Sequence, residues 1–114
     1  MSSAAPPVQL PEALTDPAMK EAVNAFLTAW TAKHGDADPY AAARAYDAMM
    51  VIDKGVTAAK TTDGAAVRDA IEKLPPFQGA AASYSFSPDA HMGIVKNPFF
   101  IGVVQQGGKL ALAK

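Results

Sequence analysis

The stretch that decides the fold runs from residue 67 to residue 89 and reads VRDAIEKLPPFQGAAASYSFSPD. Its first part is helical, because apolar side chains recur every three or four residues with charged ones between them. The double proline ends that pattern, since proline lacks the N–H that a helix needs. From Ala82 the period becomes two, with Tyr84 and Phe86 alternating with serines. The sequence therefore predicts a change from helix to strand within this stretch.

Two further helices are predicted before this one. Asp16 followed by Pro17 is a helix-start pattern, an N-cap acceptor and then proline at the first helical position, and Asp38 with Pro39 repeats it. The first helix is expected to end at Gly35. The apolar positions that recur along it at helical spacing are Met19, Val23, Phe26, Leu27 and Trp30.

The second predicted helix has a wide apolar face. It is rich in alanine, which has the highest helix propensity. The apolar stripe and the positions that widen it are Ala45, Met49, Ile52 and Val56, then Ala42, Tyr46 and Met50. We expect both sides of this stripe to meet protein, because a face this wide exceeds what one neighbouring element covers.

The two ends of the chain differ in composition. Residues 1–14 contain three prolines among small residues and are predicted to form an extended, Pro-rich arm, followed by a single domain over residues 15–114. Residues 99–104 and 109–113 are predicted strands joined by a Gly-Gly turn, which makes a closing hairpin. The predicted fold class is therefore α+β, with three α-helices followed by a short antiparallel β hairpin or meander.

Composition excludes several classes of protein. The 114 residues include no cysteine, which removes disulfides, Cys-based zinc sites and thiol nucleophiles, and ten basic against eleven acidic side chains lack the positive charge of a nucleic-acid binder. No apolar run approaches the ~20 residues that span a membrane. Residues 1–7 lack the features of a secretory signal, so the chain is expected to stay in the cytoplasm when it is expressed from Met1.

No catalytic, metal or cofactor site is predicted. His34 and His91 lie on different predicted elements, and a metal would need both of them with a carboxylate such as Asp36 or Asp89. The serines of the alternating stretch lack the Gly-x-Ser-x-Gly context of a nucleophile. The sequence therefore favours a protein that is not an enzyme and needs no cofactor.

Several short blocks occur in an order that is typical of one family. They are residues 8–12 (VQLPE), 45–49 (AYDAM), 62–64 (TDG) leading to 67–71 (VRDAI), and 77–79 (FQG) leading to 84–89 (YSFSPD), with His91, Gly93 and residues 108–110 (GKL) also fitting. With these blocks the chain resembles the C-terminal third of a type I periplasmic solute-binding protein, of the branched-chain amino acid or leucine-binding receptor type of ABC transporters.

The resemblance implies a fragment of a two-lobed α/β fold, one partial solute-binding lobe, in which hinge closure traps an amino-acid-like ligand between the lobes. It also implies a periplasmic protein with a role in amino acid transport. The parallel sheet and the loops that grip the ligand's charged groups in the family have no counterpart among these residues. The chain is therefore expected to be unable to bind ligand by itself.

Two departures from the family pattern affect predicted turns. Ala82 and Ala90 stand where the family commonly has glycine. Alanine resists positive φ, so these turns are expected to differ from the family's or to carry about 1 kcal/mol of strain.

The resemblance also points to ligand-binding residues in one stretch. In the family, an apolar side chain near the start of the second helix covers the hydrocarbon part of the ligand, and Tyr40 or Ala41 matches that position, with Tyr46 on the same helix. The alternative is that Tyr40 lies at the surface with its hydroxyl in water. Asp47 is expected to make a buried or capping hydrogen bond, because a buried carboxylate without a donor is costly.

A second hypothesis is a stand-alone interaction module that plays no part in transport. Three helices and a hairpin cover only part of the apolar surface of the first two helices, so a homodimer is predicted with Phe26, Trp30, Met49 and Ile52 at its interface. The alternatives are that Phe26 and Trp30 belong to the core, and that the hairpin folds over the helices and leaves a monomer.

Overall fold

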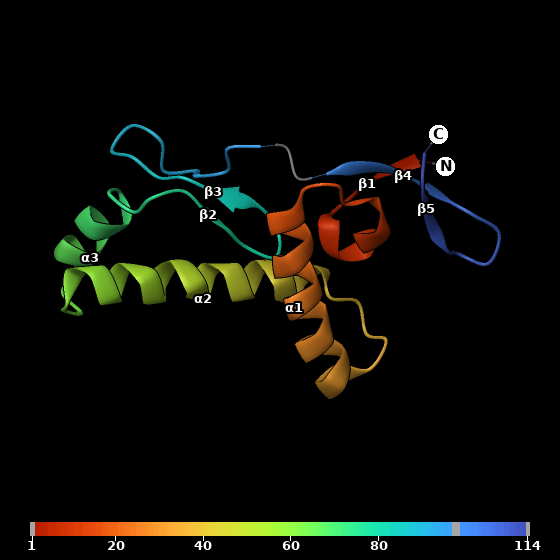
Figure 1. Cartoon of the computed structure of the whole chain (residues 1–114), viewed down its shortest axis with the longest axis horizontal. Coiled ribbons are helices and arrows are strands. Elements are labelled where there is room, and N and C mark those ends of the chain that lie inside the picture. The colour runs from red at the N-terminus through yellow and green to blue at the C-terminus, as the bar shows by residue number, and fades with distance from the viewer. Residues whose placement is uncertain (1, 97–98, 114) are drawn as a thin grey trace.

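The computed structural model describes residues 2–96 and 99–113, with α-helices at its centre and a small sheet at one end (Figure 1). The helices and 3-10 turns are η1 (Pro7–Gln9), η2 (Pro11–Ala13), α1 (Pro17–His34), α2 (Tyr40–Ala59) and α3 (Gly64–Ile71). The strands are β1 (Ser2–Ala5), β2 (Phe77–Gln78), β3 (Ser83–Tyr84), β4 (Phe100–Val104) and β5 (Leu110–Leu112). Helix α1 crosses α2 near its start, and α3 lies at its other end.

Helix α1 begins at the predicted cap, whereas α2 begins at Tyr40, one residue later than the Asp38-Pro39 pattern predicts, and its N-cap Pro39 makes no side-chain cap hydrogen bond. The Asp16 carboxylate accepts a hydrogen bond from the Met19 N–H at 3.0 Å, and the Asp63 carboxylate accepts one from the Ala66 N–H at 3.0 Å. Helix α1 ends before Gly35, whose φ of +62° favours glycine. The two ends of α1 were predictable because each depends on residues within one turn.

Two small antiparallel sheets complete the fold. Strands β4 and β5 form the predicted closing hairpin, and β1 joins the free edge of β4, so the order is β1-β4-β5. Strands β2 and β3 pair separately, with Phe77 opposite Tyr84. The strand predicted from Ala82 to Phe86 is shorter than its alternation suggested, and β3 covers Ser83–Tyr84. From Tyr84 onward this segment forms isolated bridges, such as that between Tyr84 and Ile94. The predicted fold class is confirmed.

The prediction of an extended arm over residues 1–14 is wrong beyond Ala5. Two 3-10 turns follow β1, and Pro7 and Pro11 take their first positions, where a helical turn requires no N–H donor. Val8, Leu10 and Leu14 of this segment are buried. This segment therefore belongs to the same core as the helices.

The core lies where the 3-10 turns meet α1 and the start of α2. Its buried members are Val8, Leu14, Val23, Phe26, Ala43 and Ala80, with Met19, Leu27, Trp30, Ala42, Ala81 and Phe100 packed against them. A second contact joins α2 to α3, where Gly55 lies against Ile71 and Val67 so closely that a methyl group would overlap Ile71. The small residues of α2 thus allow close packing at both of its ends.

The apolar stripe of α2 does not meet protein on both sides. Met49 is 63% exposed and Ile52 is 49% exposed, whereas the fully buried positions of α2 are Ala43, Asp47 and Gly55. The prediction is therefore wrong for this stripe. The physical reason is that the contacts of α2 are made by its opposite side, through a buried carboxylate and a glycine that the hydrophobic pattern does not reveal.

The predicted strain at Ala82 and Ala90 is also absent. Among the described residues other than glycine, positive φ occurs only at Lys60, with a value of 56°. The Ala82 carbonyl accepts a hydrogen bond from the Gly79 N–H at 2.8 Å, and the Ala90 N–H donates to the Ser87 carbonyl at 3.1 Å. Both turns thus close with ordinary backbone angles.

Candidate functional site

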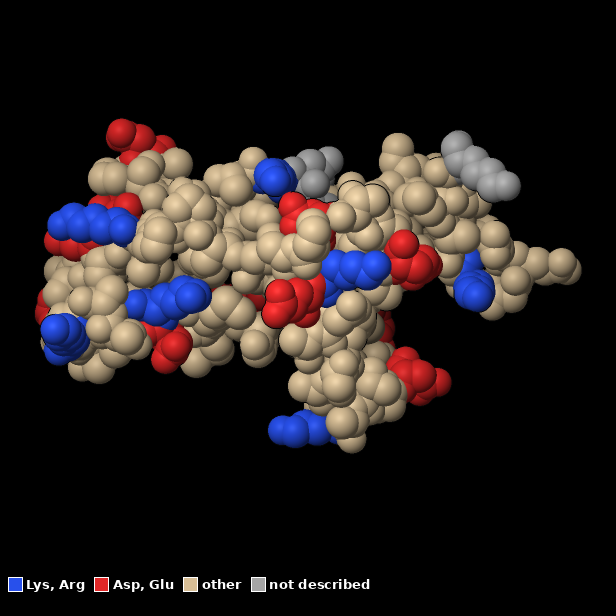
Figure 2. Space-filling model, viewed as in Figure 1, with Lys and Arg blue, Asp and Glu red and all other residues tan. Residues whose placement is uncertain are grey.

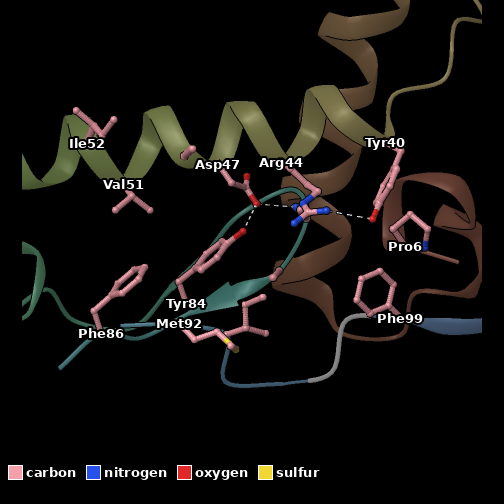
Figure 3. A pocket seen from close by; sticks show the side chains of 14 residues that line it. Pro6, Tyr40, Arg44, Asp47, Val51, Ile52, Tyr84, Phe86, Met92 and Phe99 are labelled. Atoms are coloured by element: carbon pink, nitrogen blue, oxygen red, sulfur yellow. Dashed lines mark hydrogen bonds between the residues drawn. The ribbon is translucent and has the colours of Figure 1, made fainter. Parts of the chain in front are cut away.

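A buried carboxylate, that of Asp47, ties α2 to the loop between β2 and β3. The side chain is 1% exposed. Its Oδ1 accepts from the Ala80 N–H at 2.7 Å, and its Oδ2 accepts from the Ala81 N–H at 2.7 Å and from the Tyr84 hydroxyl at 2.9 Å. We call Asp47, Ala80, Ala81 and Tyr84 the Asp47 clamp, and Figure 3 shows Asp47 with Tyr84. The expectation that Asp47 makes a buried hydrogen bond is confirmed.

Glycine at position 79 allows the clamp to close. A Cβ atom there would overlap the Asp47 carboxylate, so a side chain would hold the loop away from α2. Gln78 supports the loop from the other side: its Nε2 donates to the Gly79 carbonyl at 2.8 Å, and its Oε1 accepts from the Ser83 hydroxyl at 2.6 Å. The loop therefore reaches Asp47 with its N–H groups already directed at the carboxylate.

The Tyr84 hydroxyl is held as a donor. Burial raises the pKa of Tyr84 well above its usual value, and the hydrogen bond to Asp47 and the negative charge of that carboxylate raise it further. The ring packs between Phe77 and Phe86, whose ring centres lie 5.4 and 6.1 Å away. Tyr84 thus stays protonated at neutral pH and completes the clamp.

An open groove of about 540 Å³ lies beside the clamp. Helix α2 forms one wall, and residues 81–94 together with Phe99 form much of the other, as Figure 3 shows. Its lining is mainly apolar and comprises Pro6, Tyr40, Arg44, Asp47, Ala48, Val51, Ile52, Ala81, Ala82, Tyr84, Phe86, Met92, Ile94 and Phe99. Met92 is 85% exposed and Ile94 is 47% exposed, so the groove opens widely to solvent.

One end of the groove carries a cation and an aromatic ring. The Arg44 guanidinium lies 5.8 Å from the centre of the Tyr40 ring, and its Nη1 donates to the Tyr40 hydroxyl at 3.3 Å. Pro6 and Phe99 lie next to Tyr40 in the close view (Figure 3). This end of the groove has the chemistry to contact a small molecule that combines an apolar part with an anionic group.

The structure separates the predicted ligand-binding residues. Tyr40 lines the groove, whereas Ala41 is exposed and does not line it. Tyr46 lies outside the groove, with its ring centre 5.3 Å from that of Phe26. The roles of Tyr40, Ala41 and Tyr46 as ligand contacts stay predictions.

The four predicted interface residues also differ in position. Phe26 is buried and Trp30 is half-buried, with their ring centres 6.2 Å apart and the Trp30 indole N–H donating to the Ala37 carbonyl at 2.9 Å. Met49 and Ile52 are exposed on α2. A partner could therefore reach the second pair directly, and the interface itself stays a prediction.

The two histidines lie on different elements. His34, at the end of α1, stacks on Trp30 with ring centres 4.0 Å apart, and the Nε2 of His91 lies 2.8 Å from a Glu72 carboxylate oxygen. Over residues 2–96 and 99–113, no group of three or more His, Asp or Glu side chains is placed to hold a metal ion.

Sequence reasoning missed Arg44, Met92 and Ile94 as groove residues. Arg44 follows Tyr40 by four residues, a spacing that places two side chains on one face of a helix, so this pair could have been found. Met92 and Ile94 reach the groove from a loop and follow Arg44 by 48 and 50 residues, and no local pattern marks them.

The comparisons with known proteins identify the class. A family model described as periplasmic binding protein matches residues 2–109. The chain therefore belongs to the periplasmic binding protein family, whose members are periplasmic or extracellular and typically have no enzymatic activity. In the described part of the chain, no helix combines the length and the apolar character that crossing a membrane requires.

Solved structures show how much of the fold is present. Rp1789 from Rhodopseudomonas palustris matches with a TM-score of 0.85 at 26% identity, over 100% of this chain and 34% of its own. An extracellular ligand-binding receptor from Rhodopseudomonas palustris HaA2 matches with a TM-score of 0.84 at 24% identity, over 100% of this chain and 34% of its own. A type 1 periplasmic binding protein from Bordetella pertussis matches at 0.68 and 27% identity, over 82% of this chain and 29% of its own.

The chain thus spans about a third of the length of the solved relatives that it matches. No curated protein sequence matches it.

Proposed function

We propose that this chain forms part of the ligand-binding lobe of an extracellular solute receptor, related to those for amino acid uptake, and that it has no catalytic activity. The observation that carries the proposal is the family match over residues 2–109. The mixture of charges on the surface suits this function better than nucleic-acid binding, because lysines and arginines are scattered among acidic side chains on the face in Figure 2.

Within this proposal, Tyr40 contacts the ligand. It begins α2 and faces the groove beside Arg44, so its ring can cover an apolar group while the guanidinium faces a carboxylate. An amino-acid-like solute has both features. Ala41 is the alternative contact, since it matches the same family position and is exposed.

Ligand binding by the chain alone is expected to be weak. The chain holds about a third of the length of its solved relatives, and one side of a cleft makes only part of the contacts to a ligand. We predict a dissociation constant above ~1 mM for leucine, phenylalanine or related acids, which corresponds to less than about 4 kcal/mol of binding free energy. Isothermal titration calorimetry tests this, with a Tyr40→Ala variant as control. Micromolar affinity would show instead that the chain is a self-sufficient binder.

A second candidate function is self-association without a role in transport. The exposure of Met49 and Ile52 favours it, because large apolar side chains in water gain free energy when a second copy covers them. Light scattering at tens of micromolar distinguishes an 11.8 kDa monomer from a homodimer. A dimer that Met49→Lys dissociates would support self-association, whereas a monomer at these concentrations would refute it.

A further inference from the structure

The groove beside the Asp47 clamp lies between two walls, and apolar side chains on both walls remain exposed to solvent. Ile52 on α2 and Ile94 in the segment after β3 are each about half exposed, and Met92 is 85% exposed. These three side chains face one apolar groove of about 540 Å³. Monomeric proteins seldom leave so much contiguous apolar surface open, so a groove of this kind marks a place where another part of a protein docks.

The structural comparisons indicate what covers it. All of this chain superposes on Rp1789 with a TM-score of 0.85, yet it accounts for only 34% of that chain. The arrangement of α1, α2, α3 and both sheets is therefore the one that this segment has while it is held within a whole receptor. Two thirds of the receptor fold has no counterpart among these residues, and an apolar groove between α2 and the segment after β3 is left open.

We propose that the part of the groove around Ile52, Met92 and Ile94 is the docking surface for the remaining two thirds of a periplasmic binding protein fold, a polypeptide that covers these residues with apolar side chains of its own. This partner rests on the proposed function, because it presumes that the chain is a receptor segment. The chemistry of this part of the groove is complementary to such a polypeptide, because its walls are aliphatic and aromatic, and the end with Tyr40 and Arg44 is left for the ligand.

Mixing the two parts tests the proposal. The 114-residue chain is combined with the Rp1789 polypeptide from which the matched third has been removed, and sedimentation velocity follows a one-to-one complex. We expect Ile52→Glu and Ile94→Glu each to weaken the complex by about tenfold or more, since each places a charge in an apolar contact. Ala58→Glu is the matched control: it puts the same charge on an exposed position of α2 outside the groove and should leave the affinity unchanged.

If the shortened Rp1789 does not fold alone, a hybrid of the two parts in one polypeptide provides a second test. This chain replaces the matched third of Rp1789, and thermal unfolding is compared between the hybrid and the free chain. If the groove is covered, Ile94→Glu lowers the melting temperature of the hybrid much more than that of the free chain. Equal shifts in the two, or a hybrid with no cooperative transition, would overturn the proposal.

The other outcomes separate this inference from the proposed function. A homodimer of the free chain that Ile52→Glu dissociates would overturn the proposal, because a second copy would then be the occupant. A one-to-one complex that has the expected sensitivity but binds no amino-acid-like solute would support the docking surface and contradict the receptor function.

Discussion

The two sides of α2 reverse the usual distribution of polar and apolar residues. On one side a carboxylate, that of Asp47, is 1% exposed, and on the other Met49 is 63% exposed. The buried carboxylate is stable because three donors satisfy it, and among the described residues no buried side-chain nitrogen or oxygen lacks a hydrogen-bond partner. The comparison shows that the burial of this position of α2 depends on hydrogen-bond donors from a loop distant in sequence, which an apolar pattern along the helix does not reveal.

The largest effect is expected from removing the buried carboxylate. Asp47→Ala leaves the Ala80 N–H buried without its acceptor and separates α2 from the loop, at a cost of about 3–5 kcal/mol. Urea unfolding measures the change, which would remove much of the ~5–15 kcal/mol that stabilises a typical domain. Asp53→Ala, at an exposed position of the same helix, is the control and should cost less than about 0.5 kcal/mol. Equal losses in the two variants would show that the clamp does not contribute to the free energy of unfolding.

A smaller loss is expected when the clamp is forced open. Gly79→Ala places a methyl group against the Asp47 carboxylate, and the displacement should cost about 1–3 kcal/mol. Gly64→Ala is the matched control, because nothing lies within 4 Å of the added methyl group and the residue starts α3. We expect the control to leave the urea midpoint unchanged or slightly higher. A Gly79→Ala variant as stable as the parent would contradict the close approach.

Removing one donor should have a still smaller effect. Tyr84→Phe retains the packing of the ring and loses the hydrogen bond to Asp47, which should cost about 1–1.5 kcal/mol. The effect should also depend on pH. Since the folded state raises the pKa of Tyr84, it holds that proton more tightly than the unfolded chain does.

The stabilisation from this raised pKa is therefore complete below the ordinary tyrosine pKa of about 10 and is lost as the pH rises above it. Urea midpoints measured from neutral to alkaline pH should fall less steeply for Tyr84→Phe than for the parent chain. Tyr40 and Tyr46 are present in both proteins and provide the internal control. Identical slopes would mean that folding does not raise the pKa of Tyr84.

The smallest effect on folding is expected on the exposed side of α2. Met49→Lys should change the free energy of unfolding by less than about 0.5 kcal/mol, because the side chain already lies mostly in water. Urea unfolding at low protein concentration measures this. A loss as large as that for Tyr84→Phe would show that Met49 is covered, and the contrast between the two sides of α2 would not hold.

The parts of the fold that were predictable depend on local residues. The cap at Asp16, the end at Gly35 and the closing hairpin each follow from a few neighbouring residues, and the structure has all three. The burial of Val8, Leu10 and Leu14 was not predictable, because proline composition excludes an α-helix but does not exclude 3-10 turns.

The candidate site was predictable only in part. Its Tyr40 side was inferred from the family resemblance, and the hydrogen bonding of Asp47 was inferred from the cost of a buried carboxylate without donors. The donors themselves lie 33 to 37 residues further along the chain, and the second wall of the groove comes from residues 92–94. Contacts over such separations depend on how α2 and the loop pack. The spacing of apolar residues, every two in a strand or about every 3.6 in a helix, carries no information about that packing.

The pairing of β1 with β4 also has a consequence for the order of folding. Ser2 lies opposite Val103, so this contact joins residues from the two ends of the described chain. The helices and the β4–β5 hairpin need only short-range contacts, and proteins form such contacts faster than distant ones. Closing a longer loop costs little extra free energy, about 0.6 kcal/mol for each doubling of its length, but the search takes longer. The strand β1 is therefore expected to add last, onto a β4 edge that the hairpin has already formed.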